Sequence, residues 1–303
     1  MKNCRFAGLF LLFMLFMTLS CTAQGLAVRG IDVRVLVDSA AYFPQLSPDG
    51  SRLLYSNTEG TQLTLLDLGT GATTVVAAEG YPGFDARFAP DGKVYYVTQQ
   101  LMPGNLVYRT GNCYDPATGK HRVVLKAQHG AVHVVPASKG LAMVGEDKTF
   151  TTSKDVGRYA YTHGPTLIIV DGKTRHEVQP VDDCVGYLWA SFAPSGQRVL
   201  FHAAAKGDYV TNAQGRLLQR IDYTMMPCWV DDDHIVGMTS RQGNVQRSTD
   251  SQLVVYKVGD LQGVVVSAPD EEAIQPMVAA GHVVYTTPRG TVKMMKLDFT
   301  PQP

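Results

Sequence analysis

The chain contains 303 residues, and its 27 Lys and Arg side chains balance 27 Asp and Glu side chains, so the formal net charge at pH 7 is zero. A neutral chain without a long basic run lacks the electrostatic footprint of a nucleic-acid-binding protein, which excludes that class of function. The length fits one large domain or two ordinary ones.

The first residues predict export. Positive charge at Lys2 and Arg5 precedes an apolar run from Phe6 to Leu19. A membrane-spanning helix needs about 20 residues, so this shorter run is typical of the core of a signal peptide. Small residues before Gln24 predict cleavage after Ala23, which divides the chain into a signal peptide (residues 1–23) and a mature domain (residues 24–303). The mature protein is then periplasmic or secreted.

A lipoprotein is the alternative to soluble export. In that case Cys21 would carry the lipid and hold the chain at a membrane. Leu19 sits one place too late for the usual lipoprotein pattern, so the residues favour soluble export over lipid anchoring.

The mature chain begins with an expected strand near Val28 to Val37, where valines alternate with other residues. A turn phrase then recurs: Pro48-Asp49-Gly50, Pro90-Asp91-Gly92 and Pro194-Ser195-Gly196 each follow an apolar and a small residue and precede an apolar strand. Pro fixes the first corner of a tight turn and Gly tolerates the positive φ at its end, so each phrase predicts a β-hairpin.

Three degraded copies bring the number of phrases to six. The apolar residues that anchor them are Leu46, Phe88, Val134, Phe192, Trp229 and Met277. Their separations of 37 to 58 residues match one four-stranded propeller blade each. Asp or Asn residues before a turn mark the expected ends of the third strands, at Asp67, Asp115, Asp171, Asn212, Asp260 and Asp298.

The last blade lacks a fourth strand, because only five residues follow Asp298. The spare strand near Val28 to Val37 can fill this place and remove two open sheet edges. The sequence therefore predicts an all-β fold: one six-bladed β-propeller closed by its N-terminal strand in the last blade.

The Pro-Asp-Gly phrases and the Asp67-x-x-Thr70-Gly71 turn resemble the repeat of TolB-type propellers, a WD-like family of bacterial cell envelopes. The resemblance covers about Val28 to Phe299. It implies a docking platform for proteins or peptides, and its motifs are structural, so it assigns no functional residue.

The excess length of blades two, three and five falls between their second and third strands, at Gln99–Asn105, Glu146–Gly164 and Ser240–Gln252. Insertions on one face of a repeat scaffold are usually where binding occurs. Together with aromatic residues at the blade entrances, these loops predict an aromatic and cationic binding face. The candidate ligand-binding residues are Phe150, Lys154, Arg158, Tyr159, Tyr161, His163, Tyr187, Trp189, Arg241 and Arg247.

The sequence assigns no catalytic residue, metal site or cofactor, because the nucleophile-elbow, zinc-protease and phosphate-loop motifs are absent. Asp231-Asp232-Asp233-His234 occupies a hairpin-turn position and is interpreted as a turn. Cys113, Cys184 and Cys228 allow at most one internal disulfide and leave one thiol over.

Two functions follow. The favoured one is an exported, envelope-associated, monomeric scaffold that binds a protein or peptide, and it is not an enzyme. The alternative is a carbohydrate-binding or glycan-processing protein, of the lyase or hydrolase class, that uses the same face.

Overall fold

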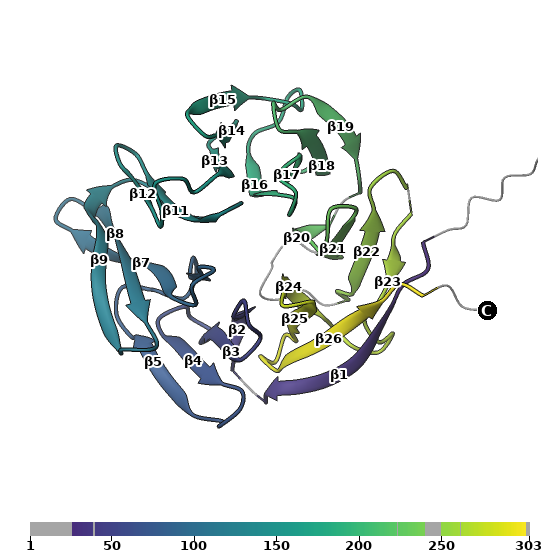
Figure 1. Cartoon of the computed structure of the whole chain (residues 1–303), viewed down its shortest axis with the longest axis horizontal. Helices are drawn as coiled ribbons and strands as arrows, with labels where there is room; N and C mark the ends of the chain where they lie inside the picture. Colours follow the sequence, from purple (N-terminus) through teal and green to yellow (C-terminus); the bar gives the residue numbers. More distant parts are fainter. Residues whose placement is uncertain (1–25, 39, 223, 240–249, 261, 301–303) are drawn as a thin grey trace, which may run out of the picture.

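The computed structural model describes residues 26–38, 40–222, 224–239, 250–260 and 262–300. The expected signal peptide (residues 1–23), with Cys21, lies outside these residues. The described strands form six hydrogen-bonded sheets in a ring, which is the expected all-β, six-bladed β-propeller (Figure 1). None of the described segments forms a helix that could cross a membrane.

Five blades contain four strands each. Blade one contains β2 (Tyr42–Leu46), β3 (Arg52–Ser56), β4 (Leu63–Asp67) and β5 (Thr73–Ala77). Blade two contains β6 (Arg87–Phe88), β7 (Val94–Met102), β8 (Leu106–Asp115) and β9 (Lys120–His129). Blade four contains β16 (Tyr187–Phe192), β17 (Arg198–Ala203), β18 (Gly207–Asn212) and β19 (Leu217–Arg220). Blade five contains β20 (Met225–Trp229), β21 (His234–Met238), β22 (Leu253–Lys257) and β23 (Val264–Val265). Blade six contains β24 (Ile274–Ala279), β25 (His282–Thr286), β26 (Val292–Asp298) and the N-terminal β1 (Arg29–Val37).

The turn residues act as the sequence predicts. In the first hairpin Gly50 has a φ of 73°, and Asp49 Oδ1 accepts hydrogen bonds from the Ser47 hydroxyl (2.5 Å) and the Ser51 amide (3.1 Å). These bonds, with that of the Ser47 hydroxyl the strongest, lower the pKa of Asp49 to about 2. At the end of β4, Asp67 Oδ1 accepts from the Thr70 amide at 2.9 Å. Short acidic side chains thus bond the backbone that turns behind them.

Blade three differs from the expectation. Its sheet has six strands: β10 (Val132–Ala137), β11 (Gly140–Gly145), β12 (Thr149–Thr151), β13 (Arg158–His163), β14 (Thr166–Asp171) and β15 (Thr174–Val178). They run in the order β12-β11-β10-β13-β14-β15, and only the Ala137–Tyr159 pair joins β10 to β13. The segment 146–164, expected to be a loop, therefore holds two strands, because the alternating residues of β13 form a hairpin with β14.

The two halves of blade three pack against different neighbouring blades, while Val135, Ala142 and Val144 of the first half also pack against Tyr159 and Tyr161 of the second. Val134, Leu141 and Met143 of the first half join a core cluster with β7 and β8 of blade two. Leu167 and Ile169 of the second half join a cluster with blade four. Figure 1 shows the halves pointing to different parts of the rim. This division brings the inner strand β13 to the centre of the ring.

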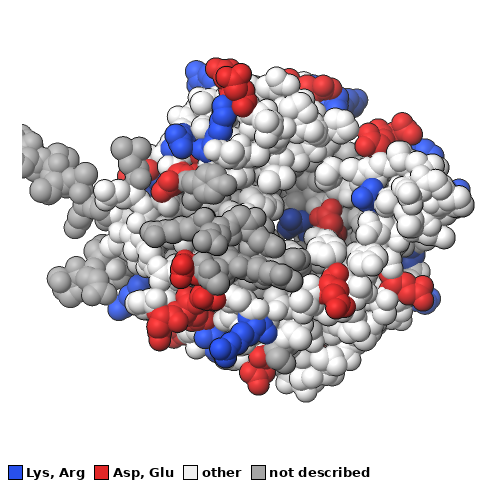
Figure 2. Space-filling model, turned by 180° about the vertical axis from the view of Figure 1, so that it is seen from behind, with Lys and Arg blue, Asp and Glu red and all other residues white. Residues whose placement is uncertain are grey.

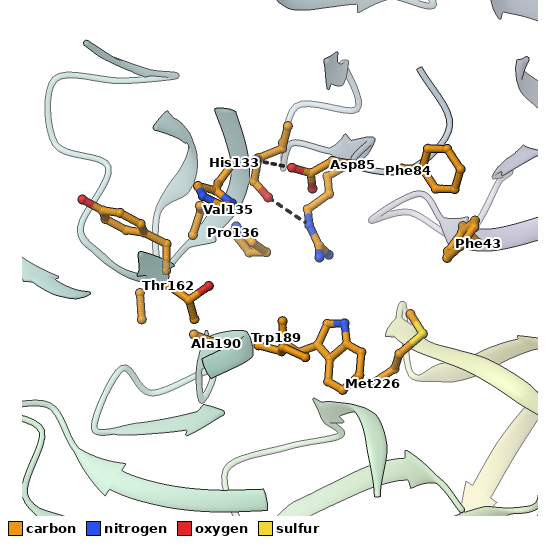
Figure 3. Close-up of a pocket in the computed structure, with 15 residues that line it drawn as sticks. Phe43, Phe84, Asp85, His133, Val135, Pro136, Thr162, Trp189, Ala190 and Met226 are labelled. Carbon is orange, nitrogen blue, oxygen red and sulfur yellow. Dashed lines mark hydrogen bonds between the residues drawn. The ribbon is translucent and has the colours of Figure 1, made fainter. Parts of the chain in front are cut away.

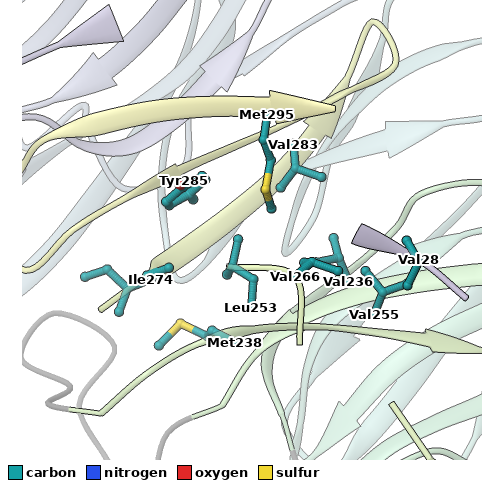
Figure 4. Packing of buried hydrophobic residues seen from close by; sticks show 11 residues of the cluster. Val28, Val236, Met238, Leu253, Val255, Val266, Ile274, Val283, Tyr285 and Met295 are labelled. Carbon is teal, nitrogen blue, oxygen red and sulfur yellow. The ribbon is translucent and has the colours of Figure 1, made fainter. Parts of the chain in front are cut away.

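The ring is closed as predicted. Strand β1 pairs antiparallel with β26, with Arg34 opposite Met294 and Val35 opposite Lys293. Arg29 Nη2 lies 2.8 Å from Asp298 Oδ2 at the end of this pair. Val28, just before β1, is buried in a cluster that joins blades five and six (Figure 4). Both ends of the described chain are therefore held in one sheet.

Candidate functional site

A cavity of about 520 Å³ opens where the innermost strands begin, near the axis of the ring. Figure 2 shows it as a hollow that contains basic and acidic groups among uncharged atoms. Blades one to five all contribute to its wall, which consists of Phe43, Phe84, Asp85, Arg87, His133, Val134, Val135, Pro136, Ala160, Tyr161, Thr162, Leu188, Trp189, Ala190 and Met226. The wall is thus mainly apolar and aromatic, with a few polar groups (Figure 3).

Three of the apolar side chains are directed into the cavity by the same backbone feature, a β-bulge with a positive φ. Phe43, Trp189 and Met226 have φ values of 52°, 52° and 51°, and each lies at a β-bulge in the innermost strand of its blade. A left-handed conformation at a non-glycine residue costs about 1–3 kcal/mol and concentrates at functional sites. β-bulges commonly re-aim a side chain. In Figure 3 the three side chains face the cavity from three blades.

A buried polar pair stands behind Trp189. The Trp189 ring centroid lies 5.2 Å from the His202 ring centroid, and His202 Nδ1 lies 2.8 Å from Asp208 Oδ1. Asp208 Oδ2 also accepts a hydrogen bond from the Thr224 amide at 3.0 Å. Burial raises the pKa of the Asp208 carboxyl despite these bonds. The network fixes one side of the indole from blade four.

The polar part of the wall is organised around one residue, Val134 of β10. Its amide donates to Asp85 Oδ2 at 3.0 Å, and its carbonyl accepts from Arg87 Nε at 3.1 Å, as the dashed lines in Figure 3 show. Burial raises the pKa of the Asp85 carboxyl, although Arg87 opposes this effect. Burial also lowers the pKa of the neighbouring His133. The wall therefore combines the guanidinium of Arg87, a carboxyl whose pKa is raised and an imidazole whose pKa is lowered.

Two smaller cavities adjoin the first one. A cavity of about 160 Å³ shares His133 and Tyr161 with it and adds the polar side chains of Glu146, His163 and Arg175. On the other side of the ring, a cavity of about 370 Å³ shares Arg87 and Pro136. Arg87 therefore lies between the two cavities along the axis.

The structure brings three of the expected binding residues to these cavities. Tyr161 and Trp189 line the 520 Å³ cavity, and His163 lines the 160 Å³ cavity. Tyr159 stacks on Tyr161, with ring centroids 6.3 Å apart. Lys154 is exposed and away from all three cavities.

Three other candidates have bonding or packing partners within the fold. Phe150 stacks on Tyr95, with centroids 5.9 Å apart, in the core between blades two and three. Arg158 pairs with Asp171 at 2.9 Å. Tyr187 is buried, and its hydroxyl bonds the Val181 backbone. Arg241 and Arg247 lie outside the described residues.

Sequence reasoning missed Phe43, Phe84, Asp85, Arg87 and His133. A positional signal was present: Asp85 precedes Phe88 by three residues, as Phe43 precedes Leu46. Four residues at this place in the repeat, Phe43, Asp85, Trp189 and Met226, line the 520 Å³ cavity. The three apolar side chains among them converge because of the β-bulges, and the residue types Phe, Trp and Met give no sequence signal of a bulge.

Cys113, Cys184 and Cys228 are free thiols, so no disulfide joins them. The Asp231–His234 run forms the expected turn, where Asp231 Oδ1 accepts from the His234 amide at 2.8 Å. Across the described ranges, no group of three His, Cys, Asp or Glu side chains is arranged to hold a metal ion.

No protein-family model matches the chain, and no curated protein matches its sequence. Solved structures do resemble it. A chain of a mitotic checkpoint complex superposes with a TM-score of 0.61 at 11% identity, over 97% of this chain and 99% of that chain. An oligogalacturonate lyase in complex with manganese gives a TM-score of 0.51 at 15% identity, over 86% and 78% of the two chains. At these identities the likeness concerns the fold, and TolB-type membership stays a prediction; the chain is a β-propeller.

Proposed function

We propose that this chain is an exported binding protein that captures a peptide segment of an envelope protein in the 520 Å³ cavity. The supporting observation is the convergence of Phe43, Trp189 and Met226 from three blades on one space. An apolar cavity with a few directed polar groups is the usual form of a binding site. A bulge with the same positive φ recurs at Gln275 of blade six, which does not line the cavity, so the bulge belongs to the repeat. The support for binding is that three of these bulges direct Phe, Trp and Met side chains into one space.

The rim of the cavity is also apolar. Phe84 and Leu188 line it and are 48% and 45% exposed. Contiguous exposed apolar groups around a concavity are typical of an interaction site. Aromatic and aliphatic side chains of a peptide would bury this rim, while the polar groups near Val134 would bond its backbone.

Saccharide binding or turnover is the second candidate. The observation that favours it is the 160 Å³ cavity, in which His133, Glu146, His163 and Arg175 gather beside Tyr161. Polar groups of this kind suit hydroxyl and carboxylate groups on sugars. The fold is also that of the oligogalacturonate lyase mentioned above.

Arrays of peptides from envelope proteins and of oligosaccharides, probed with the purified domain (residues 24–303), distinguish the two candidates. We expect selective peptide binding that Leu188→Ala weakens at least fivefold. Leu218→Ala is the matched control, since Leu218 on β19 is 46% exposed and does not line the cavity. Equal weakening by the two variants, or selective binding of sugars alone, would contradict the peptide proposal.

A further inference from the structure

The guanidinium of Arg87 has bonding capacity left over. An arginine presents five N–H donors in a planar fork. Nε of Arg87 donates to the Val134 carbonyl, which fixes the plane of the group. Within the part of the chain that the structure describes, the Nη1 and Nη2 atoms form no hydrogen bond or ion pair. Four directed donors are therefore available at the inner end of an apolar cavity.

A cation in this setting favours an anionic ligand. Asp85 is the acidic group in the cavity wall. Among the described residues it forms no salt bridge with Arg87, although the Arg87 charge opposes the rise in the pKa of its carboxyl. A charge removed from water is stabilised by an opposite charge with good hydrogen-bond geometry. The fork of an arginine matches a carboxylate in a bidentate manner, which a lysine cannot reproduce.

The position of Arg87 favours the end of a chain over its middle. Arg87 and Pro136 are the residues shared by the 520 Å³ cavity and the 370 Å³ cavity on the opposite side of the ring. A ligand that enters past Leu188 and Phe84 meets the Arg87 fork at the innermost point of the larger cavity. A terminal group can stop there, whereas a continuous chain would have to pass the guanidinium.

Asp85 offers the complementary acceptor. Its Oδ2 is occupied by the Val134 amide, and Oδ1 has no hydrogen-bond donor among the described residues. Asp85 and Arg87 are thus held on the N–H and the C=O of the same residue, Val134. A C-terminal residue carries its own amide N–H close to its carboxylate, so it can bond both groups together. Its side chain then meets the aromatic wall of Phe43 and Trp189.

We propose that the cavity recognises the free C-terminus of a peptide ending in an apolar residue, with the terminal carboxylate on the Arg87 fork and the last amide N–H on Asp85. This inference rests on the proposed peptide-binding function. It makes the site specific for chain ends rather than for internal segments.

Two pools of N-acetylated random hexapeptides, one ending in a free acid and the other in an amide, test this inference. Binding is followed by fluorescence, because Trp189 lines the cavity while the second of the two tryptophans, Trp229, is buried in blade five. We expect the acid pool to bind at least tenfold more tightly than the amide pool. Arg87→Gln should remove this preference and Arg87→Lys should reduce it, whereas the exposed Arg216→Gln should leave it unchanged.

The outcomes separate the two proposals. Equal binding of both pools by the unmodified protein would overturn the C-terminus inference and leave the peptide-binding function standing. Binding of neither pool at 1 mM total peptide would overturn the peptide-binding function and the inference with it. Tighter binding of a galacturonate trimer than of the acid pool would assign the carboxylate to a sugar. The comparison of pools needs no variant, so a variant that fails to fold does not affect it.

Discussion

Gly30 lies where β1 closes the ring, and it gives a direct test of this closure. A Cβ atom at this position would lie 2.5 Å from the Val266 carbonyl oxygen and 2.7 Å from Met295 Sδ. The methionine can move, but the carbonyl belongs to the backbone that follows β23. Overpacking of this kind costs about 1–3 kcal/mol. Replacing glycine by alanine also stabilises the folded state by up to about 1 kcal/mol, because it lowers the conformational entropy of the unfolded chain.

Gly30→Ala should therefore lower the free energy of unfolding by about 1–2 kcal/mol net. For a domain of this size the change corresponds to a melting temperature lower by roughly 2–8 °C. The assay is thermal unfolding followed both by circular dichroism and by the fluorescence of Trp189 and Trp229. Because closure couples the blades, both signals should fall together at the lower temperature.

Gly69→Ala is the control for this experiment. The Cβ atom there would meet only Asp67 Oδ1, at 3.5 Å, which is an ordinary contact. This variant should not melt below the unmodified protein, and the gain through the unfolded chain alone should raise its melting temperature by up to about 4 °C. A Gly30→Ala variant with an unchanged melting temperature would refute the packing argument. A lower transition in circular dichroism without a matching shift in tryptophan fluorescence would refute the coupling of the blades.

Two further predictions concern charged groups. Hydrogen bonds from Thr300 and from the Arg29 guanidinium lower the pKa of Asp298 to about 2, so its stabilising effect is present above the ordinary value of 3.8 and is lost as the pH falls through about 2. Asp298→Asn should therefore melt below the unmodified protein at pH 7, and the difference should vanish below about pH 2; a difference independent of pH would contradict the assignment. Asp208→Ala removes the buried acceptor of the Thr224 amide and the partner of His202, and we expect a loss of about 3 kcal/mol in urea unfolding. A loss under about 1 kcal/mol would show that the network behind Trp189 is unimportant for stability.

The architecture could be predicted from the sequence because each turn depends only on the residues that form it. Pro48, Asp49 and Gly50 bond and bend only their own backbone, so their meaning does not depend on distant residues. Closure by β1 followed from counting, since the residues after Asp298 are too few for a strand. The turns depend on local residues, whereas closure rests on the number of strands in the repeat.

The divided third blade and most of the cavity wall required three-dimensional information. The alternation of Tyr159 and Tyr161 before the Gly164-Pro165 turn is a strand signal, but the expected blade length assigned this stretch to a loop. Asp85 and Arg87 meet β10 through bonds to Val134, more than 45 residues away in the sequence. Tyr161 and Trp189 were predicted among the binding residues, although from two unrelated signals.

The pairing of β1 with β26 also sets the order of events during synthesis. The Arg29–Asp298 contact joins residues 269 positions apart. Strand β1 therefore has no partner strand until β26 has been synthesised. Until β26 has been made and has paired with β1, the edges of these two strands stay open to proteases and to other chains. A prematurely terminated product would keep this open edge permanently and could be told from the finished protein by it.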